Sequence, residues 1–355
     1  MKEKMNFKAC NCSSYNTNKE TSIEHVELVL SNKDYVYFGE DNRLPEVFYG
    51  AYTNCSTLQA VVNTVSDYVY GGGSMEQDRA VNRKGEMLSD LVQRCILDYI
   101  IFGAFTLQVI RSKDHQIVEL NYVDVRHVRL NADGTKVYVY NNWSKYCRNI
   151  RSYEAFNGSA EQGNSVLYYK NPRSRTLYGT PLWSAALKDA LTLVEASNMN
   201  YNTVKNQFTP TTMISFTNGT PSEDVQDKIE QMIYEKFTTS GGNNIMLTWS
   251  DDREHMPEVK SFETPDYTDR YTRVMETSRN NILVAFRCSG QLVGLIEGQT
   301  GFNDVEFTNS FSLFKTTVIR PLQMEIEKAF KFLGIKLTLK EFNVMFVNSN
   351  EKNVV

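Results

Sequence analysis

The chain has 355 residues, of which 41% are hydrophobic and 23% are charged, so most of it is expected to fold. Its formal net charge is −4, whereas proteins that hold nucleic acid by its phosphates normally carry a strong basic excess. The chain therefore either does not meet nucleic acid or touches it without gripping it.

The six cysteines and four histidines do not follow the pattern of a metal site or a disulfide framework. Only Cys10 and Cys12 lie close together, and one residue between them is fewer than the roughly two to four of common zinc pairs. We expect free thiols in a reducing cytoplasm and no cofactor. No stretch of about 18 apolar residues occurs, which argues against a membrane-spanning helix.

The N-terminal part begins with a polar arm and continues into strands and helices. Residues 1–22 are expected to be flexible, because they are rich in Asn and Ser and lack the apolar core of a signal peptide. Short β-type runs follow within 23–38. Apolar residues at helical spacing then predict helices over 45–69 and about 84–101, the first of them ended by three glycines.

After residue 102 the apolar period changes from helical to alternating, which predicts strands. Four runs have this character, at 104–111, 116–122, 125–130 and 166–170. Asp133-Gly134 predicts a tight hairpin, because Gly tolerates the positive φ that such a turn needs. We interpret 151–165 as a surface loop, and the first half of the chain as an α+β domain.

Three helices of the second half are each expected to begin at a Thr-Pro pair, since Thr caps free N–H groups and Pro fits the first helical position. They are predicted at 181–207, 221–238 and 265–287. Met199 of the first helix and Val274 of the third belong to their apolar faces. Strands are expected around the middle helix, at 211–216, 244–249 and 257–262.

A glycine-rich stretch, 290–301, precedes the last predicted helix. It is read as a loop that is either a buried connector or a mobile segment projecting into a shared space. The final helix is expected over 304–333, with a kink at Pro321, which cannot donate the helical hydrogen bond. Strands are expected after it, at 335–340 and 342–347.

No arrangement of residues indicates catalysis. The run Gly71-Gly72-Gly73-Ser74 lacks the Lys and the spacing of a phosphate-binding loop and is read as a turn. The cluster of Asp251, Asp252, Glu254 and His255 could bind a metal, but residues so close in sequence are more typical of a solvated turn. The chain is therefore expected not to be an enzyme.

Several short motifs follow one another in a characteristic order. They are GEDN (39–42) with LP (44–45), YVYGGG (68–73), YIIFGAF (99–105), YGTPLW (178–183), NILVAFR (281–287) with LVG (292–294), and VIRPLQ (318–323). By these motifs the chain resembles the portal proteins of tailed, double-stranded DNA bacteriophages, over roughly 35–335. Each motif alone is weakly specific, but their order and spacing together are fairly specific.

The resemblance implies a portal-like α+β fold and a non-enzymatic ring subunit. Its implied parts are a wing (23–180), two stem helices (181–208 and 265–289) enclosing an α/β clip (209–264), a tunnel loop (290–303), a kinked wing or crown helix (304–334), and C-terminal strands with a tail (335–355). The family's ring is usually dodecameric, and twelve copies at −4 would carry roughly −48. Such a charge suits a channel that a polyanion passes without sticking.

The resemblance also implies partners and a location. The partners are other copies in a ring at one capsid vertex, the terminase large subunit, the major capsid and scaffold proteins, a head–tail adaptor, and double-stranded DNA bound non-specifically in the channel. No membrane is expected. The protein would belong to the virion, and to the host cytoplasm during assembly. Two alternatives stay open: another virion structural protein, such as an adaptor or minor head protein, and a DNA-processing enzyme.

Candidate site residues follow from these implied parts. For the tunnel loop they are Gln291, Leu292, Val293, Gly294, Glu297, Gln299, Thr300 and Phe302. For clip contacts to partners they are Glu223, Asp224, Lys228, Asp251, Asp252 and Arg253. For the stem they are Arg270, Arg273 and Arg279. The stem arginines either face the lumen as a basic belt or pair with acidic groups such as Asp189, Glu195, Asp269 and Glu276.

Overall fold

The computed structural model describes residues 34–143, 147, 149–158, 163–205, 212–216, 221–222, 224–229, 231, 245–249, 268–295 and 304–342. These residues divide between two compact units. The first unit draws on 1–50, 62–184 and 311–355, and the second on 51–61 and 185–310. The predicted arm, 1–22, lies outside the described residues.

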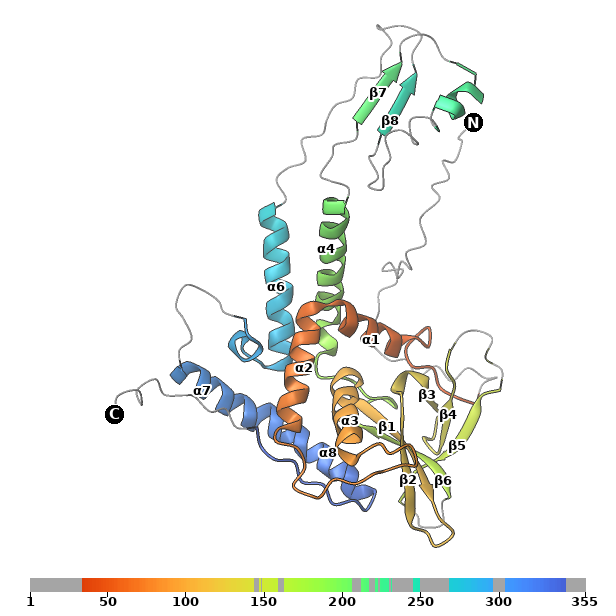
Figure 1. The fold of residues 1–355 in the computed structure, drawn as a ribbon, viewed down its shortest axis with the longest axis vertical. Coiled ribbons are helices and arrows are strands. Elements are labelled where there is room, and N and C mark those ends of the chain that lie inside the picture. Colours follow the sequence, from red (N-terminus) through yellow and green to blue (C-terminus); the bar gives the residue numbers. More distant parts are fainter. Residues whose placement is uncertain are drawn as a thin grey trace. The chain divides into compact units, whose positions relative to one another are not determined.

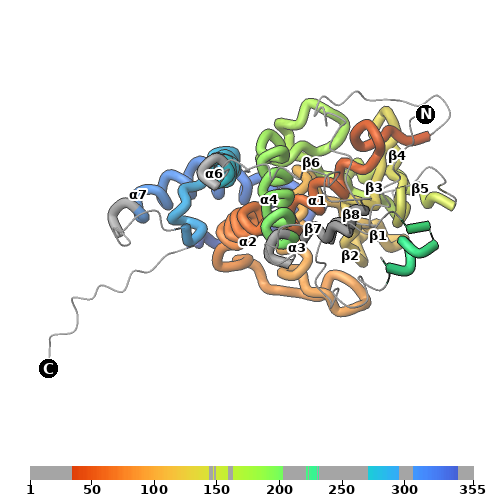
Figure 2. The backbone as a smooth tube through the Cα atoms, turned by 90° about the horizontal axis from the view of Figure 1, so that it is seen from above, coloured from red at the N-terminus to blue at the C-terminus, as the bar shows by residue number. Residues whose placement is uncertain are grey.

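The first unit contains a mixed six-stranded sheet, which lies to one side of its helices in Figure 1 and is seen from above in Figure 2. Its strands, in the order β2-β1-β6-β5-β4-β3, are β1 (Ala104–Arg111), β2 (Ile117–Val123), β3 (Val128–Leu130), β4 (Lys136–Val139), β5 (Arg151–Ala155) and β6 (Asn164–Lys170). Neighbouring strands are antiparallel, except that β5 and β6 are parallel. The sheet and the helices of this unit confirm the predicted mixture of α and β structure.

The hairpin predicted at Asp133-Gly134 joins β3 to β4, and Gly134 has the expected positive φ of 66°. The loop predicted at 151–165 is wrong, because it contains β5 and the start of β6. β5 pairs through its backbone while its side chains stay largely exposed, so it has no alternating apolar pattern to find. The strand predicted at 125–130 begins instead with a 3₁₀ turn, Val125–His127, which Asp124 caps.

Three helices precede the sheet in the chain: α1 (Leu44–Asn54), α2 (Ser56–Tyr70) and α3 (Leu88–Phe102). The single helix predicted over 45–69 is therefore two helices separated at Cys55. α3 starts later than predicted, because residues 81–86 form a turn. In this turn the Val81 N–H donates to the Glu86 carbonyl, and Gly85 has a φ of 80°. The apolar face of α3 packs against β1.

The motifs at 99–105 and 178–183 meet in the core of the first unit. α3 ends at Gly103, whose φ is 71°, and a Cβ there would lie 2.3 Å from the carbonyl carbon of Thr180. A Cβ at Gly179 would lie 2.5 Å from the Gly103 oxygen. Trp183 is fully buried and donates from Nε1 to the Ile100 carbonyl at 3.0 Å. Both glycines are therefore required by the close approach of two backbones.

The backbone of the glycines at 71–73 contacts the segment around Lys340, near the C-terminal end of the first unit. The Lys340 N–H donates to the Gly73 carbonyl at 2.8 Å, and a Cβ at Gly71 would lie 2.1 Å from the Lys340 oxygen. Buried Gln323 donates from Nε2 to the Val69 carbonyl at 2.9 Å. The strand predicted at 335–340 is wrong: this pairing is short and yields only one isolated bridge. All but the first residue of 342–347 lies outside the described residues.

The last long helix is built from α7 (Asp304–Phe314), a π-helical turn (Lys315–Ile319) and α8 (Arg320–Phe332). The π turn stands directly before Pro321, whose ring nitrogen has no hydrogen to donate. In it, the Thr316 and Thr317 hydroxyls each donate to a carbonyl four residues earlier. The backbone around Pro321 is thus rearranged, while a kink there remains a prediction.

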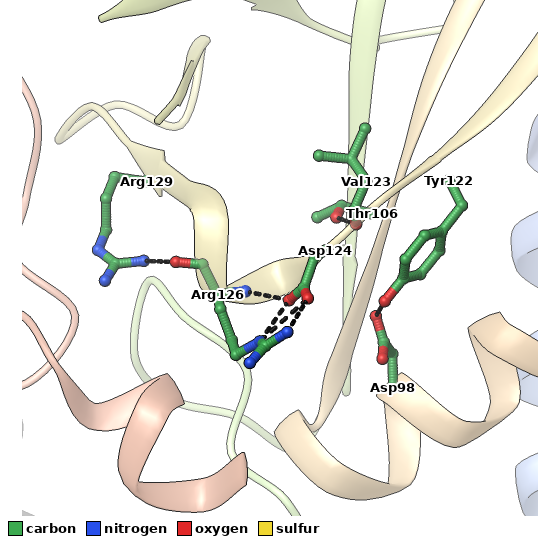
Figure 3. A network of polar contacts seen from close by, with 7 residues as sticks. All are labelled: Asp98, Thr106, Tyr122, Val123, Asp124, Arg126 and Arg129. Carbon is green, nitrogen blue, oxygen red and sulfur yellow. Dashed lines mark hydrogen bonds and ion pairs between the residues drawn. The ribbon is translucent and has the colours of Figure 1, made fainter. Parts of the chain in front are cut away.

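A polar network links α3 to the sheet (Figure 3). The Tyr122 hydroxyl donates to the Asp98 carboxylate at 2.8 Å, and Asp98 is buried. Burial, followed by the nearby Asp124 carboxylate, raises the pKa of Asp98 well above its usual range, although the bond from Tyr122 opposes this. Asp124 itself pairs with Arg126 at 2.5 Å. The guanidinium of Arg126 lies over the ring of Tyr49, 3.9 Å from its centroid.

The second unit contains α4 (Leu187–Lys205), α6 (Thr268–Phe286) and a parallel pair of strands, β7 (Thr212–Phe216) and β8 (Ile245–Trp249). These two strands confirm the predictions at 211–216 and 244–249. α4 does not begin at Pro181 as predicted, because a turn and a 3₁₀ segment, Ser184–Ala186, precede it. Of the helix predicted at 221–238, residues 224–229 and 231 are described and helical. The strand at 257–262 lies outside the described residues.

Candidate functional site

The long helices α4 and α6 pack side by side and antiparallel within the second unit (Figure 1). The Asn281 amide donates to the Asp189 carboxylate at 2.9 Å, and the Tyr271 hydroxyl donates to the Ala196 carbonyl. The later residue of α6 thus contacts the earlier residue of α4, and the reverse, as expected for antiparallel helices. The two helices also carry small or apolar side chains that are buried: Leu187, Ala190, Ala196, Ile282, Leu283 and Phe286.

The same two helices also carry large apolar side chains that are open to solvent in the single chain. Their exposed fractions are 62% for Met199, 66% for Tyr201, 43% for Val274 and 73% for Val284. Met199 and Val274 were predicted on the apolar faces of their helices, where burial within one chain would be the ordinary outcome. Apolar surface of this kind on long helices indicates that another molecule covers it.

Two arginines of α6 add positive charge to the pair. Arg273 is exposed and Arg279 is half-buried. Neither forms an ion pair with another described residue. Asp189, one of their predicted partners, accepts a hydrogen bond from the Asn281 amide instead. Of Arg270, the structure describes only the backbone, which belongs to α6. The described contacts therefore leave Arg273 and Arg279 available for neighbouring subunits or for a channel.

The segment after α6 is more ordered than its glycines suggest. It forms a 3₁₀ turn, Gly290–Val293, which ends at Gly294 with φ of 80°. Leu292 is buried, and the Leu295 N–H donates to the Gly290 carbonyl at 2.8 Å. Buried Cys288 lies two residues before this turn, and burial raises the pKa of its thiol to about 12. The first part of the predicted loop is thus anchored as a connector would be.

The remaining predicted residues are only partly described. Asp224 and Lys228 are exposed on the helical segment 224–229. Eight others lie outside the described residues: Glu223, Asp251, Asp252, Arg253, Glu297, Gln299, Thr300 and Phe302. The exposure of Val284 and Tyr201 was not predicted. For Val284 the reason is that a continuous apolar run such as ILVAF (282–286) does not reveal which of its residues stays uncovered.

The described residues do not form a metal site or a membrane-spanning helix. Among the described residues, no three His, Cys, Asp or Glu side chains come together as they would around a metal ion. The cluster at 251–255 lies outside those residues. None of the described helices is both long and apolar enough to cross a membrane. Cys55, Cys95 and Cys288 are free thiols.

Comparison with known proteins identifies relatives. The family model described as phage portal protein matches residues 85–351. No curated protein matches the chain. A chain in the virion of a native gene transfer agent particle is 15% identical, with a TM-score of 0.53 over 84% of this chain and 83% of that one. A chain in the neck of the native particle, computed with C12 symmetry, is 14% identical, with a TM-score of 0.51 over 82% and 81%.

A crystal structure of an HK97 family phage portal protein from Corynebacterium diphtheriae is also similar. It is 15% identical, with a TM-score of 0.47 over 82% of this chain and 94% of that one. The two likenesses to the gene transfer agent concern the fold alone. The family assignment comes from the family model, which covers well over half of the chain.

Proposed function

Because this chain belongs to the phage portal protein family, which is structural and not enzymatic, we propose that it is one subunit of a ring at a single capsid vertex. The ring, of about twelve copies, is the conduit through which double-stranded DNA is packaged and ejected. It also gives a docking site to the terminase large subunit and, later, to a head–tail adaptor. The protein acts in the virion, after assembly in the host cytoplasm.

The observation that carries this proposal is the exposure of large apolar side chains on α4 and α6. A ring needs heterologous contacts, in which one patch of a subunit meets a different patch on its neighbour. Val284 and Met199 are large, apolar and mostly exposed in the single chain. Their burial against a neighbouring copy would supply the hydrophobic core of such an interface. An enzyme that acts as a monomer has no such need.

The charge of the chain fits a passage for DNA. A lumen that bound phosphates tightly would resist movement, because each Lys or Arg paired to a phosphate adds affinity. The net charge of −4 per chain keeps that attraction weak. Arg273 and Arg279 either pair with a neighbouring subunit or form a sparse basic belt in the channel. A basic belt would add a salt-dependent drag on DNA, and intersubunit pairs would not.

The family's parts are assigned to the described elements on the same basis. The sheet and α1–α3 form the wing, α4 and α6 form the stem, and β7, β8 and the helical segment 224–229 form the clip. Asp224 and Lys228 are exposed there, as residues that contact terminase or adaptor would be. The segment from residue 290 to 303 forms the tunnel loop. The helix α7–α8 leads back to the wing or crown.

Negative-stain imaging of the purified protein, with light scattering, tests the ring. Twelve copies of 40.8 kDa give about 490 kDa, and a disc with a central hole is expected. Protein that stays monomeric at every concentration, even with its capsid partners, would contradict the proposal. Imaging of particles separates the closest alternative, since a minor head protein would lie at many vertices and a portal at one.

A further inference from the structure

A cationic groove opens on the surface of the first unit, between the start of β2 and the end of α8. Its volume is about 570 Å³, and its walls come from 79–81, the β1–β2 turn and 331–335. We call it the β2–α8 groove. Three of its lining residues are permanently cationic, Arg79, Arg111 and Lys331, and His115 lies with them. No Asp or Glu is among the described residues that line it.

The groove is held open by contacts in its walls. Arg111 donates from Nη1 to the His115 carbonyl at 2.7 Å, which fixes the β1–β2 turn. The Leu120 N–H donates to the Val81 carbonyl at 2.8 Å, which fixes the opposite wall. The ring of Phe332 meets the ring of Phe156 edge-on at 5.3 Å. These contacts give a preformed depression and not a gap between loose segments.

Two features of the groove lack a counterpart in the single chain. Val118 is 54% exposed and Phe332 is 48% exposed, so both present apolar surface to solvent at the groove. The guanidinium of Arg111 lies over the Phe156 ring, and its Nε is buried without an acceptor among the described residues. A buried donor without an acceptor is costly. An occupant of the groove could not reach this buried Nε, but its apolar side chain would cover Val118 and Phe332, and its carboxylate oxygens would meet the exposed cations Arg79 and Lys331.

We propose that the β2–α8 groove binds an acidic, partly apolar peptide segment of another protein, with its carboxylates facing Arg79 and Lys331. Charge complementarity argues for an acidic occupant, because local cations stand out in a chain whose net charge is −4. The exposed Val118 and Phe332 favour a peptide over the sugar–phosphate backbone of DNA, which offers no aliphatic side chain. The groove lies wholly within the first unit and does not require a ring.

Fluorescence anisotropy with a labelled twelve-residue peptide of Glu, Leu and Phe tests the proposal. A peptide with Lys in place of each Glu, and a DNA duplex of about twelve base pairs, are the competing probes. We expect the acidic peptide to bind at least about tenfold more tightly than its Lys counterpart at low salt, since rim charges act mainly through electrostatics. Equal binding of the two peptides, or no binding, would overturn the groove's assignment without touching ring assembly.

Variants locate the binding. The double change Arg79→Glu and Lys331→Glu should weaken the acidic peptide by about tenfold, since two attractive contacts become repulsive. Val118→Ser, which alters only the exposed apolar surface, should weaken it by roughly threefold. Lys84→Glu makes the same charge change at an exposed residue away from the groove and should have less than about a twofold effect. The proposal is overturned if the double variant binds the acidic peptide as tightly as the wild type does. It is also overturned if the wild type binds the DNA duplex more tightly than the acidic peptide and the double variant loses that DNA binding.

Discussion

Arg129 donates a hydrogen bond of 2.6 Å from Nη2 to the backbone carbonyl of Asn42, and both residues are buried. The Arg129 Nε also donates to the Asn42 side chain, whose oxygen accepts from the Phe38 N–H at 3.0 Å. Burial lowers the pKa of this guanidinium, which no carboxylate touches among the described residues. The GEDN turn (39–42) thus binds the buried guanidinium of Arg129, which lies 87 residues later in the chain than Asn42.

Asn42→Gly tests this contact, because Gly accepts the positive φ of 62° and removes only the side chain. Two donors, one of them charged, would lose their acceptor, so the free energy of unfolding should fall by about 1–3 kcal/mol. Urea denaturation measures the loss. Asp41→Gly, at the exposed neighbouring position, should cost no more than about 0.5 kcal/mol. Equal losses at the two positions would contradict the role of Asn42.

Gly103→Ala should be severely destabilising, by about 3 kcal/mol or more, because its Cβ would collide with the Thr180 backbone and not with a movable side chain. Gly85→Ala is a matched control. Gly85 has a similar φ of 80°, but its Cβ would meet nothing within 4 Å. It should lose only the cost of a left-handed Ala, about 1 kcal/mol. Thermal unfolding of both variants separates close packing from backbone strain.

These two cases show where sequence reasoning stops. The hairpin at Gly134 could be predicted because its turn and strands are local. The contact of Gly103 with Thr180 could not, because a glycine in a sequence indicates a special backbone position without naming the segment that approaches it. Arg129 lies within the predicted strand run 125–130, and nothing in that run marks it as buried. No local pattern reveals that its partner is a turn far earlier in the chain.

The candidate site was predictable in outline only. The existence of α4 and α6 can be read from the sequence, since helical spacing is a local property, but the start of α4 cannot, because a turn and a 3₁₀ segment take the place of the predicted Thr-Pro start. The exposure of Val284 depends on what one chain leaves uncovered, which is a tertiary result. β5 was missed for a similar reason: its pairing comes from neighbouring backbones, while its own residues, RSYEA, are mostly polar.

Asp98 predicts a dependence of stability on pH. A carboxyl whose pKa is raised in the folded state binds more protons folded than unfolded, so the free energy of unfolding falls as pH rises. The fall begins near the unfolded pKa of about 3.9 and ends above the folded pKa. Asp98→Asn removes this titration and keeps an acceptor for Tyr122. Its stability advantage over the wild type should therefore be largest at alkaline pH and shrink towards about pH 4.

Urea denaturation at several pH values measures that difference. Asp90→Asn, an exposed change in the first turn of the same helix, should show no such advantage, since an acidic residue there favours the helix dipole. A difference between Asp98→Asn and the wild type that stays constant with pH would mean that Asp98 titrates alike in the folded and unfolded states.

Val284→Glu tests the assembly surface. If a neighbouring subunit covers Val284 on α6, a carboxylate at this position would be buried without a partner, at a cost of several kcal/mol. We expect the ring to dissociate in light scattering while circular dichroism of the chain stays unchanged. Val284→Ala removes apolar surface without adding charge and should keep the ring. A ring that tolerates Glu at 284 would place this residue outside the interface.

The segment after α6 can be divided into an anchor and a tip. Leu292 is buried, so Leu292→Asp should destabilise the second unit by about 3 kcal/mol and lower the yield of folded protein. The anchor would then serve the fold and not the channel. Thermal unfolding checks this, with Leu292→Met as the apolar control, which should cost less than about 1.5 kcal/mol.

Deletion of 296–301 removes the tip and spares the anchor. If the tip acts in the channel, rings should still form in negative stain, because the described contacts of 290–295 are retained. Particles assembled with this variant should package or retain less DNA, measured as the DNA content of nuclease-treated capsids. A shorter deletion of 298–299 serves as the graded control, since a contact with DNA should weaken as the loop shortens. Normal DNA content after loss of all six residues would reject a role for the loop in the channel and leave the buried connector as its only function.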